Sequence, residues 1–325
     1  MSEFKEIKIS DLDPEEFIKE KIEEISKIVG KNVKAITALS GGVDSSVTTM
    51  LGYKALSDRL KVYFIDNGLM RENEPEQVAS IFKKLGVTVE VIDAKKEFFT
   101  ALKGISDPEQ KREAITQAFY GNVFRKVIES SGARYLLQGT ILTDIEETVA
   151  GIKRQHNVFE QIGIDPEKAF GYRIIEPLIE IRKDSVRKVA KALGLPEDIY
   201  NRMPFPGPAL AARVIGEVTF EKIEIVRKAT TILEGELKLE NTGAFQYMAI
   251  LHEDKVTGMR NGKRDFGYQI ELRCWDSIDA RVATPTELSW DILKRLSKRI
   301  ATEVSGVVSV TYNITTKPPS TMEAI

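Results

Sequence analysis

Apolar residues near the start of the chain recur with the period of a helix. Pro14 precedes them and suits the first turn of a helix, where its missing N–H leaves no bond unmade. Five apolar residues then fall near one face of a 3.6-residue repeat: Phe17, Ile18, Ile22, Ile25 and Ile28. The pattern predicts a helix over residues 13–29.

Short apolar runs then alternate with helical patterns. Strands are predicted over residues 33–39, 62–65, 87–92 and 135–137, and helices up to residue 56 and over 75–85, 108–130 and 183–193. Strands that alternate with helices predict an α/β fold, with a doubly wound parallel sheet covered by helices on both faces. Residues 148–172 show no clear period and are interpreted as a long loop of the kind that serves as a lid.

Residues 204–208, with the sequence Pro-Phe-Pro-Gly-Pro, end regular structure. We place a domain boundary there, between a domain of residues 1–203 and a smaller domain of residues 204–325. The second domain is predicted to contain strands over 211–218, 244–251, 268–273 and 307–313, and helices over 220–237 and 287–303. This order indicates an α+β domain with a small mixed sheet.

The composition is that of an ordinary soluble protein. Of its 325 residues 42% are hydrophobic and 30% are charged, and a formal net charge of -2 indicates neither nucleic acid nor membrane as a partner. Two His and the single Cys274 provide no ligand set for a zinc or iron–sulfur centre and no disulfide framework. The first ten residues lack the basic and apolar pattern of a signal peptide, so we expect a cytoplasmic protein.

One segment between a predicted strand and a predicted helix carries residues suited to phosphate chemistry. It consists of Ser40, Gly41, Gly42, Val43, Asp44, Ser45 and Ser46. Open α/β sheets bind ligands at the carboxyl ends of their strands, and glycines and helix N–H groups there favour phosphate. Asp44 beside a phosphate would require an intervening cation, which indicates Mg²⁺. The segment is not a Walker A sequence, and the alternative interpretation is a simple capped glycine turn.

The same segment resembles the pyrophosphate loop of the N-type ATP pyrophosphatases, a superfamily that includes GMP synthase and NAD synthase. Its members cleave ATP between the α and β phosphates, adenylylate a carbonyl oxygen and let a nucleophile displace AMP. The resemblance implies an adenine nucleotide alpha hydrolase-like fold for residues 1–203, with ATP as substrate and Mg²⁺ as cofactor. The loop by itself does not choose among the substrates of the superfamily.

Further segments are similar to the ATP pyrophosphatase part of GMP synthase. They are residues 64–71, 138–147, 152–158, 204–214, 262–268 and 317–323, in the order of that family. This resemblance implies that ATP activates XMP and that ammonia displaces AMP to give GMP. It also implies a homodimer built on residues 204–325 and a separate glutamine amidotransferase subunit that supplies the ammonia.

The family pattern assigns roles around ATP residue by residue. Those expected to contact ATP or pyrophosphate are the loop itself, Asp66, Gly139 and Thr140. The expected Mg²⁺ ligands are Asp144 and Glu147, which lie about one helical turn apart. The residues expected to be catalytic are Asp44 and, on the lid, Lys153 and His156. From residue type alone, an exposed acidic helix start is the preferred explanation of Asp144 and Glu147, and a solvated loop is the commoner explanation of Lys153 and His156.

The pattern also assigns residues to the xanthine nucleotide. They are Arg213, Arg264, Lys317, Thr321 and Glu323. Arginine suits bidentate phosphate contacts and a carboxylate accepts from purine N–H groups, whereas the alternative is ordinary surface charge. Near them, Val307, Val308, Val310 and Tyr312 are interpreted either as a dimerisation strand or as core.

The chain departs from the family pattern at four places, two of which are Thr143 in the acidic turn and the tail Glu323-Ala324-Ile325. Ala209 stands where the family has a glycine, so a positive φ there would strain the backbone. Gln155 replaces the first of two adjacent histidines on the lid. The closest rival is an NAD synthase-like enzyme, which the junction and tail motifs argue against. A tRNA-thiolating member would require catalytic cysteines, whereas Cys274 is interpreted as core. The alternative from another class is a regulatory module that binds nucleotides without catalysis.

Overall fold

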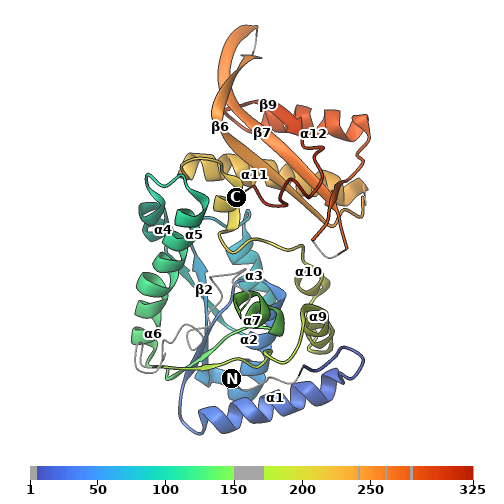
Figure 1. Ribbon diagram of the computed structural model, residues 1–325. Helices are drawn as coiled ribbons and strands as arrows, with labels where there is room; N and C mark the ends of the chain where they lie inside the picture. The colour runs from blue at the N-terminus through green and yellow to red at the C-terminus, as the bar shows by residue number, and fades with distance from the viewer. Residues whose placement is uncertain (1–5, 150–171, 241, 261, 279–280, 325) are drawn as a thin grey trace. The chain divides into compact units, whose positions relative to one another are not determined.

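The chain forms two compact units in the computed structural model, which describes residues 6–149, 172–240, 242–260, 262–278 and 281–324 (Figure 1). The first unit comprises Met1–Asp66, Glu74–Asp93 and Tyr120–Arg202. The second comprises Asn67–Asn73, Ala94–Phe119 and Met203–Ile325. Two segments that precede residue 203 therefore belong to the second unit, and the chain passes between the units more than once.

The first unit is built on a five-stranded sheet with the order β3-β2-β1-β4-β5. Every neighbouring pair is parallel. The strands are β1 (Ala35–Ala38), β2 (Leu60–Asp66), β3 (Val89–Asp93), β4 (Tyr135–Leu137) and β5 (Arg173–Ile175). The predicted parallel α/β sheet is confirmed, and β5, which periodicity did not indicate, is a short edge strand.

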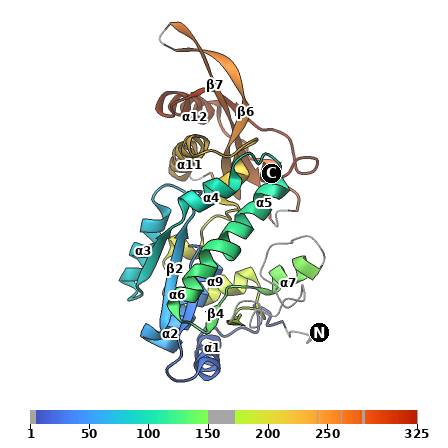
Figure 2. The ribbon, with the colours of Figure 1, turned by 90° about the vertical axis from the view of Figure 1, so that its left-hand side faces the viewer.

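Helices cover both faces of this sheet, with α3 and α6 on opposite sides of β2 in Figure 2. They are α1 (Pro14–Val29), α2 (Val43–Leu56), α3 (Glu74–Lys84), α6 (Arg125–Ser131), α7 (Leu142–Val149), α9 (Lys183–Ala192) and α10 (Glu197–Tyr200). Helix α1 shows why the prediction succeeded there. The Asp13 carboxylate accepts from the N–H groups of Glu15 and Glu16, and the apolar stripe buries Phe17 and Ile25.

The helix predicted over residues 108–130 forms in three parts. It runs as α5 (Pro108–Thr116), a wider π-helical stretch over Gln117–Phe124, and α6. Gly121 lies in the wider stretch, where the missing side chain lowers the preference for regular α geometry. Helix α4 (Lys95–Leu102) was not predicted, because only Phe98 and Leu102 mark its buried face. In the segment predicted as a loop, residues 148–149 end α7 and residues 150–171 lie outside the described part.

The second unit combines a mixed sheet with two long helices. Strands β6 (Gln246–Arg260) and β7 (Lys263–Asp276) form the long curved antiparallel hairpin of Figure 1. Strand β8 (Thr284–Pro285) pairs antiparallel and β9 (Val307–Tyr312) pairs parallel with β7. Helices α11 (Phe220–Glu240) and α12 (Trp290–Glu303) pack beside the sheet. The predicted α+β class with a mixed sheet is confirmed.

The strand predicted over residues 211–218 is wrong. Ala209–Arg213 form a short 3₁₀ helix, and Val214 makes only one isolated bridge, to Leu251. Pro206 and Pro208 lack the N–H groups that a strand would use, and Ala209 has a φ of 54°. The position where the family has glycine thus requires the left-handed backbone that the family pattern indicated, and alanine occupies it at some cost.

Lys111 in α5 is fully buried, with its Nζ donating to the Val214 carbonyl at 2.8 Å. Burial lowers the pKa of this ammonium to about 8, and nearby Lys222 acts in the same direction. Between pH 8 and 10.5 the unfolded chain therefore binds more protons at this group than the folded chain does. We expect wild-type stability to rise relative to Lys111→Met across that window, by up to about 3 kcal/mol.

Urea unfolding of both proteins at pH 7.5, 9.0 and 10.5 measures this difference. Lys103→Met, which removes an exposed lysine of the same unit, is the control and should show a stability difference that does not change with pH. A pH-independent difference for Lys111→Met as well would contradict the prediction.

Candidate active site

The segment Ser40–Ser46 forms a turn between β1 and α2, and its own side chains hold it. The Ser40 and Ser45 hydroxyls lie 2.9 Å apart, and the Ser45 hydroxyl also donates to the Gly42 carbonyl at 3.1 Å. Gly41 has a φ of +77°, a conformation that other residues rarely adopt. The loop therefore has one defined shape, set by two hydroxyls and a glycine.

The start of α2 is open to a ligand. Gly42 is the N-cap residue and no side chain caps this 14-residue helix. The N–H groups of Val43, Asp44 and Ser45 occupy the first turn, where a helix leaves its donors unsatisfied and favours an anion. Ser46 differs, because its N–H donates to the Gly42 carbonyl at 3.0 Å and its buried hydroxyl finds no partner among the described residues.

Asp44 is paired with a lysine that the sequence analysis missed. Lys183 Nζ lies 2.5 Å from Asp44 Oδ2. Burial raises the pKa of Asp44 above its ordinary value, while Lys183 opposes this and the nearby Asp144 adds to it. Lys183 is the first residue of α9, where the helix dipole disfavours a cation. A lysine at the predicted start of a helix, where a positive charge is unfavourable, is the sequence feature that could have identified Lys183.

Three further predicted ATP residues lie at or just beyond the carboxyl ends of strands. Asp66 ends β2, and Gly139 and Thr140 follow β4. A Cβ on Gly139 would come within 2.9 Å of the Asp44 carbonyl carbon, so the backbone after β4 lies directly against the loop. The Thr140 hydroxyl donates to Glu176 Oε1 at 2.5 Å. The structure thus brings Gly139 to the pyrophosphate loop and holds Thr140 through a carboxylate beside β5.

The expected Mg²⁺ ligands lie on α7. Asp144 Oδ2 accepts from the Ile141 N–H at 3.1 Å, while the side chain of Glu147 lies outside the described part. Among the described residues no group of three His, Cys, Asp or Glu side chains could hold a metal. Mg²⁺ in nucleotide enzymes commonly takes one or two carboxylates and the substrate phosphates. The residues fit that arrangement, because the buried Asp44 Oδ1 has no hydrogen-bond partner in the described part.

The two predicted lid residues, Lys153 and His156, fall within residues 150–171 and so lie outside the described residues. Their catalytic assignment stays a prediction.

In the second unit, Arg213 is fully buried at the end of the 3₁₀ helix. Its guanidinium lies 4.9 Å from the centre of the Phe205 ring, and that of Arg71 lies 4.0 Å from the same ring. None of the three Arg213 nitrogens makes a hydrogen bond within the described part of the chain. The nearest carboxylate oxygen is Glu323 Oε2, 3.5 Å from Nε. A buried guanidinium with unused donors is suited to an anionic or carbonyl-bearing ligand.

The C-terminal tail is fixed beside Arg213. Glu323 Oε1 accepts from Gln246 Nε2 at 3.0 Å, and Met322 packs in a buried cluster with Trp275. Arg273 Nη1 donates to the carbonyl of Thr321 at 3.0 Å. Lys317 bridges to Ala283 through its backbone. The structure therefore brings Arg213 and Glu323 together and holds Thr321 and Lys317 on the same tail.

Arg264, also predicted to bind the xanthine nucleotide, does not lie near Arg213 and the C-terminal tail. It lies exposed near the tip of the β6–β7 hairpin, opposite Met259. Arg264 lies nine positions before Arg273 along β7, a distance of about 30 Å at the usual strand rise. Its assignment to the xanthine nucleotide stays a prediction.

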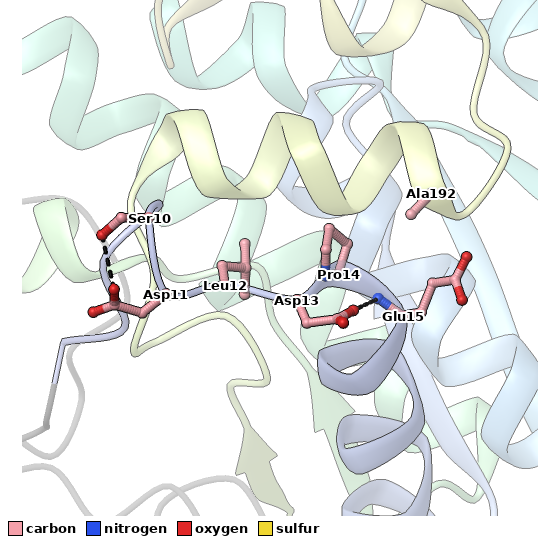
Figure 3. Close-up of a pocket in the computed structure, with 7 residues that line it drawn as sticks. All are labelled: Ser10, Asp11, Leu12, Asp13, Pro14, Glu15 and Ala192. Atoms are coloured by element: carbon pink, nitrogen blue, oxygen red, sulfur yellow. Dashed lines mark hydrogen bonds between the residues drawn. The ribbon is translucent and has the colours of Figure 1, made fainter.

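One open hollow, of about 520 Å³, lies at the start of α1 (Figure 3). Asp11, Asp13 and Glu15 contribute carboxylates to its lining, and Asp13 is already the cap of the helix. Negative charge of this density repels phosphate, so we assign no nucleotide to it.

Cys274 is a core residue, as the sequence indicated. Its side chain is buried, and burial raises the pKa of the thiol to about 12. A thiol that stays protonated near neutral pH is not a nucleophile, so Cys274 does not supply glutaminase chemistry.

Known proteins match almost the whole chain. Residues 14–202 match the PP-loop domain family, and residues 236–324 match the GMP synthase C-terminal domain family. Among curated proteins, one subunit of the GMP synthase [glutamine-hydrolyzing] of Archaeoglobus fulgidus is 49% identical over 312 residues, 96% of this chain and 99% of the relative.

The same subunits of Methanothermobacter thermautotrophicus and Pyrococcus furiosus are 46% and 47% identical, over 96% and 95% of this chain and 99% and 97% of their own lengths. Identity of this degree over both units, together with both family matches, settles the family. The chain belongs to the GMP synthase (glutamine-hydrolysing) family, as the subunit with the PP-loop and GMP synthase C-terminal domains.

Proposed function

We propose that this protein catalyses the ATP-dependent amination of XMP to GMP through an adenylyl-XMP intermediate, releasing AMP and pyrophosphate. The observation that carries the proposal is the start of α2, which no side chain caps in the described part and whose first-turn N–H groups lie beside the Asp44–Lys183 pair at the carboxyl end of β1. Such a site binds the departing pyrophosphate rather than a neutral group. Membership of the GMP synthase family supports XMP as the acceptor of the adenylyl group.

In this proposal the residues of the first unit act on ATP. The first-turn N–H groups of α2 bind the β and γ phosphates, and the Lys183 ammonium offsets negative charge as pyrophosphate leaves. Asp44, with Asp144 and Glu147, would hold Mg²⁺, whose charge stabilises the leaving group when it is bound. Lys153 and His156 would close over the intermediate and exclude water.

The residues of the second unit recognise the xanthine nucleotide in this proposal. The three side-chain nitrogens of Arg213 lack a hydrogen-bond partner in the described part, and Nε lies 3.5 Å from Glu323 Oε2. A guanidinium donates to phosphate or carbonyl oxygens, and a carboxylate accepts from purine N–H groups. Lys317, Thr321 and Arg264 complete the proposed set.

Two proteins are expected to assemble with the chain. The relatives are each named as one subunit of a glutamine-hydrolysing enzyme, and Cys274 supplies no nucleophile, so we infer that a separate glutaminase subunit delivers ammonia. We also propose a homodimer through the second unit, because Met259 and Phe266 are 75% and 64% exposed on the β6–β7 hairpin. A solution mass of two chains, measured by light scattering, tests the homodimer.

No helix in the described part of the chain is long and apolar enough to cross a bilayer. We place the reaction in the cytoplasm, where its nucleotide substrates are found.

The decisive experiment follows AMP, pyrophosphate and GMP from ATP, Mg²⁺ and ammonium chloride, with and without XMP. XMP-dependent AMP release with equal GMP formation is the expected result. Release of AMP with nicotinate adenine dinucleotide in place of XMP would favour the NAD synthase-like alternative. ATP binding without turnover on either acceptor would favour a regulatory module, and the catalytic proposal would be abandoned.

A further inference from the structure

Arg202, the last residue of the first unit, contacts the backbone of the pyrophosphate loop, residues 40–46. Arg202 Nη1 donates to the Gly41 carbonyl oxygen at 3.0 Å. The same guanidinium binds Glu74 Oε1, at the start of α3, over 2.5 Å. The Glu74 side chain is only 3% exposed, so this ion pair is little screened by solvent. The packing is close, because a Cβ on Gly41 would lie 2.8 Å from Arg202 Nη1 and 2.9 Å from Val78 Cγ2.

This contact fixes the orientation of one peptide group. In a trans peptide the carbonyl and the following N–H point in opposite directions. With the Gly41 carbonyl held toward Arg202, the Gly42 N–H points toward the other side, where it meets the Ser40 hydroxyl at 3.4 Å. Both residues are glycines, for which a peptide flip meets little steric resistance. A flip would break the contact with the Ser40 hydroxyl and point the Gly41 carbonyl oxygen to that side, where its negative partial charge disfavours phosphate.

We propose that Arg202, held by Glu74, is a positioning residue that locks the Gly41–Gly42 peptide in the orientation that binds pyrophosphate. The inference rests on the proposed function of the loop and adds a residue to it that does not touch the ligand. Arg202 acts through the Gly41 carbonyl, and Glu74 acts through Arg202.

The test compares pyrophosphate binding with stability in Arg202→Ala, Arg202→Lys and Glu74→Gln of the full chain. Binding of pyrophosphate with Mg²⁺ is measured by titration calorimetry, and KM is measured separately for ATP and for XMP. We expect Arg202→Ala to weaken pyrophosphate about tenfold and to raise KM for ATP similarly, while KM for XMP changes less than about twofold. A lysine ammonium can still donate a hydrogen bond, but it lacks the planar guanidinium that binds the Gly41 carbonyl and Glu74 together. Arg202→Lys should therefore bind pyrophosphate more tightly than Arg202→Ala and more weakly than wild type.

Arg59 provides a matched control in the same unit. Its Nη1 donates to the Gly30 carbonyl at 2.6 Å, and Gly30 also has a positive φ of +73°, so Arg59→Ala removes a similar contact away from the loop. Arg59→Ala should lower the melting temperature and leave pyrophosphate affinity unchanged. Unchanged pyrophosphate affinity in both Arg202→Ala and Glu74→Gln would overturn the inference.

Failure of the inference and failure of the proposed function are distinguishable. If wild type binds pyrophosphate and aminates XMP but the Arg202 and Glu74 variants bind equally well, only the inference fails. If wild type neither binds pyrophosphate nor aminates XMP, the proposed function fails and the inference fails with it. Should Arg202→Ala not fold, Arg202→Lys and Glu74→Gln decide the question by the same comparison.

Discussion

Gly139→Ala is expected to abolish most of the synthetase activity and to destabilise the first unit. A Cβ at this position would lie 2.9 Å from the Asp44 carbonyl carbon and 3.0 Å from both the Asp44 oxygen and the Ser45 nitrogen. All three are backbone atoms at the start of α2, so relief requires moving the pyrophosphate loop itself. We expect a loss of about 1–3 kcal/mol in the free energy of unfolding. Displacing the phosphate donors should reduce the rate, by up to about 100-fold for a shift of about 1 Å.

Urea unfolding and XMP-dependent AMP release measure the two effects. Gly235→Ala in α11 is the control, because a Cβ there meets nothing within 4 Å. A helical glycine replaced by alanine should stabilise by about 0.5–1 kcal/mol, and Gly235→Ala should leave the rate unchanged. Wild-type activity in Gly139→Ala would show that catalysis does not depend on the close packing of the backbone after β4 against the pyrophosphate loop.

The role of Gly139 illustrates what the sequence could predict. A glycine directly after a buried strand indicates a close backbone approach, and the family pattern assigned this residue to ATP on sequence alone. The parallel sheet was predictable for a similar reason, since each strand is a short apolar run followed by a helical pattern. Ala209 belongs to the same group, because the glycine that the family has there pointed to the position where a positive φ would strain alanine, and its φ is 54°.

What the sequence could not predict depends on contacts between distant residues. Lys183 meets Asp44 across 139 positions, and Arg202 meets Gly41 across 161. The periodicity of a sequence contains no information on such pairs. They form only after folding places the residues that follow different strands side by side at the carboxyl edge of the sheet. The false strand over residues 211–218 has a local cause, since its apolar pattern suits both a strand and a buried 3₁₀ turn. Only the prolines before it favoured the turn.

Lys183→Met is expected to reduce catalysis strongly while changing stability little. The Lys183 and Asp44 side chains are 44% and 23% exposed, so the ion pair is partly solvated and its loss should change the free energy of unfolding by less than about 1 kcal/mol. In the proposed reaction the ammonium would face the developing charge of pyrophosphate. Removal of one such preorganised group typically lowers kcat by about 10²–10³-fold.

The loss of activity in Lys183→Met should be larger than the missing attraction between the ammonium and pyrophosphate alone would cause. Lys183 is the cation that lowers the pKa of Asp44 against burial and the nearby Asp144. Without it, two carboxylates face the phosphates and Asp44 binds a cation less readily at neutral pH, so the Mg²⁺ concentration needed for half-maximal rate should rise. Lys183→Arg keeps the charge and should retain activity within about tenfold.

Lys191→Met, which removes an exposed lysine from the same helix, should change neither rate nor stability. AMP release at saturating XMP, measured over a range of Mg²⁺ concentrations, distinguishes the variants. If Lys183→Met lost several kcal/mol of stability and little activity, Lys183 would be a structural partner of Asp44 instead. The pyrophosphate charge would then have to be offset by the α2 N–H groups and Mg²⁺ without help from α9.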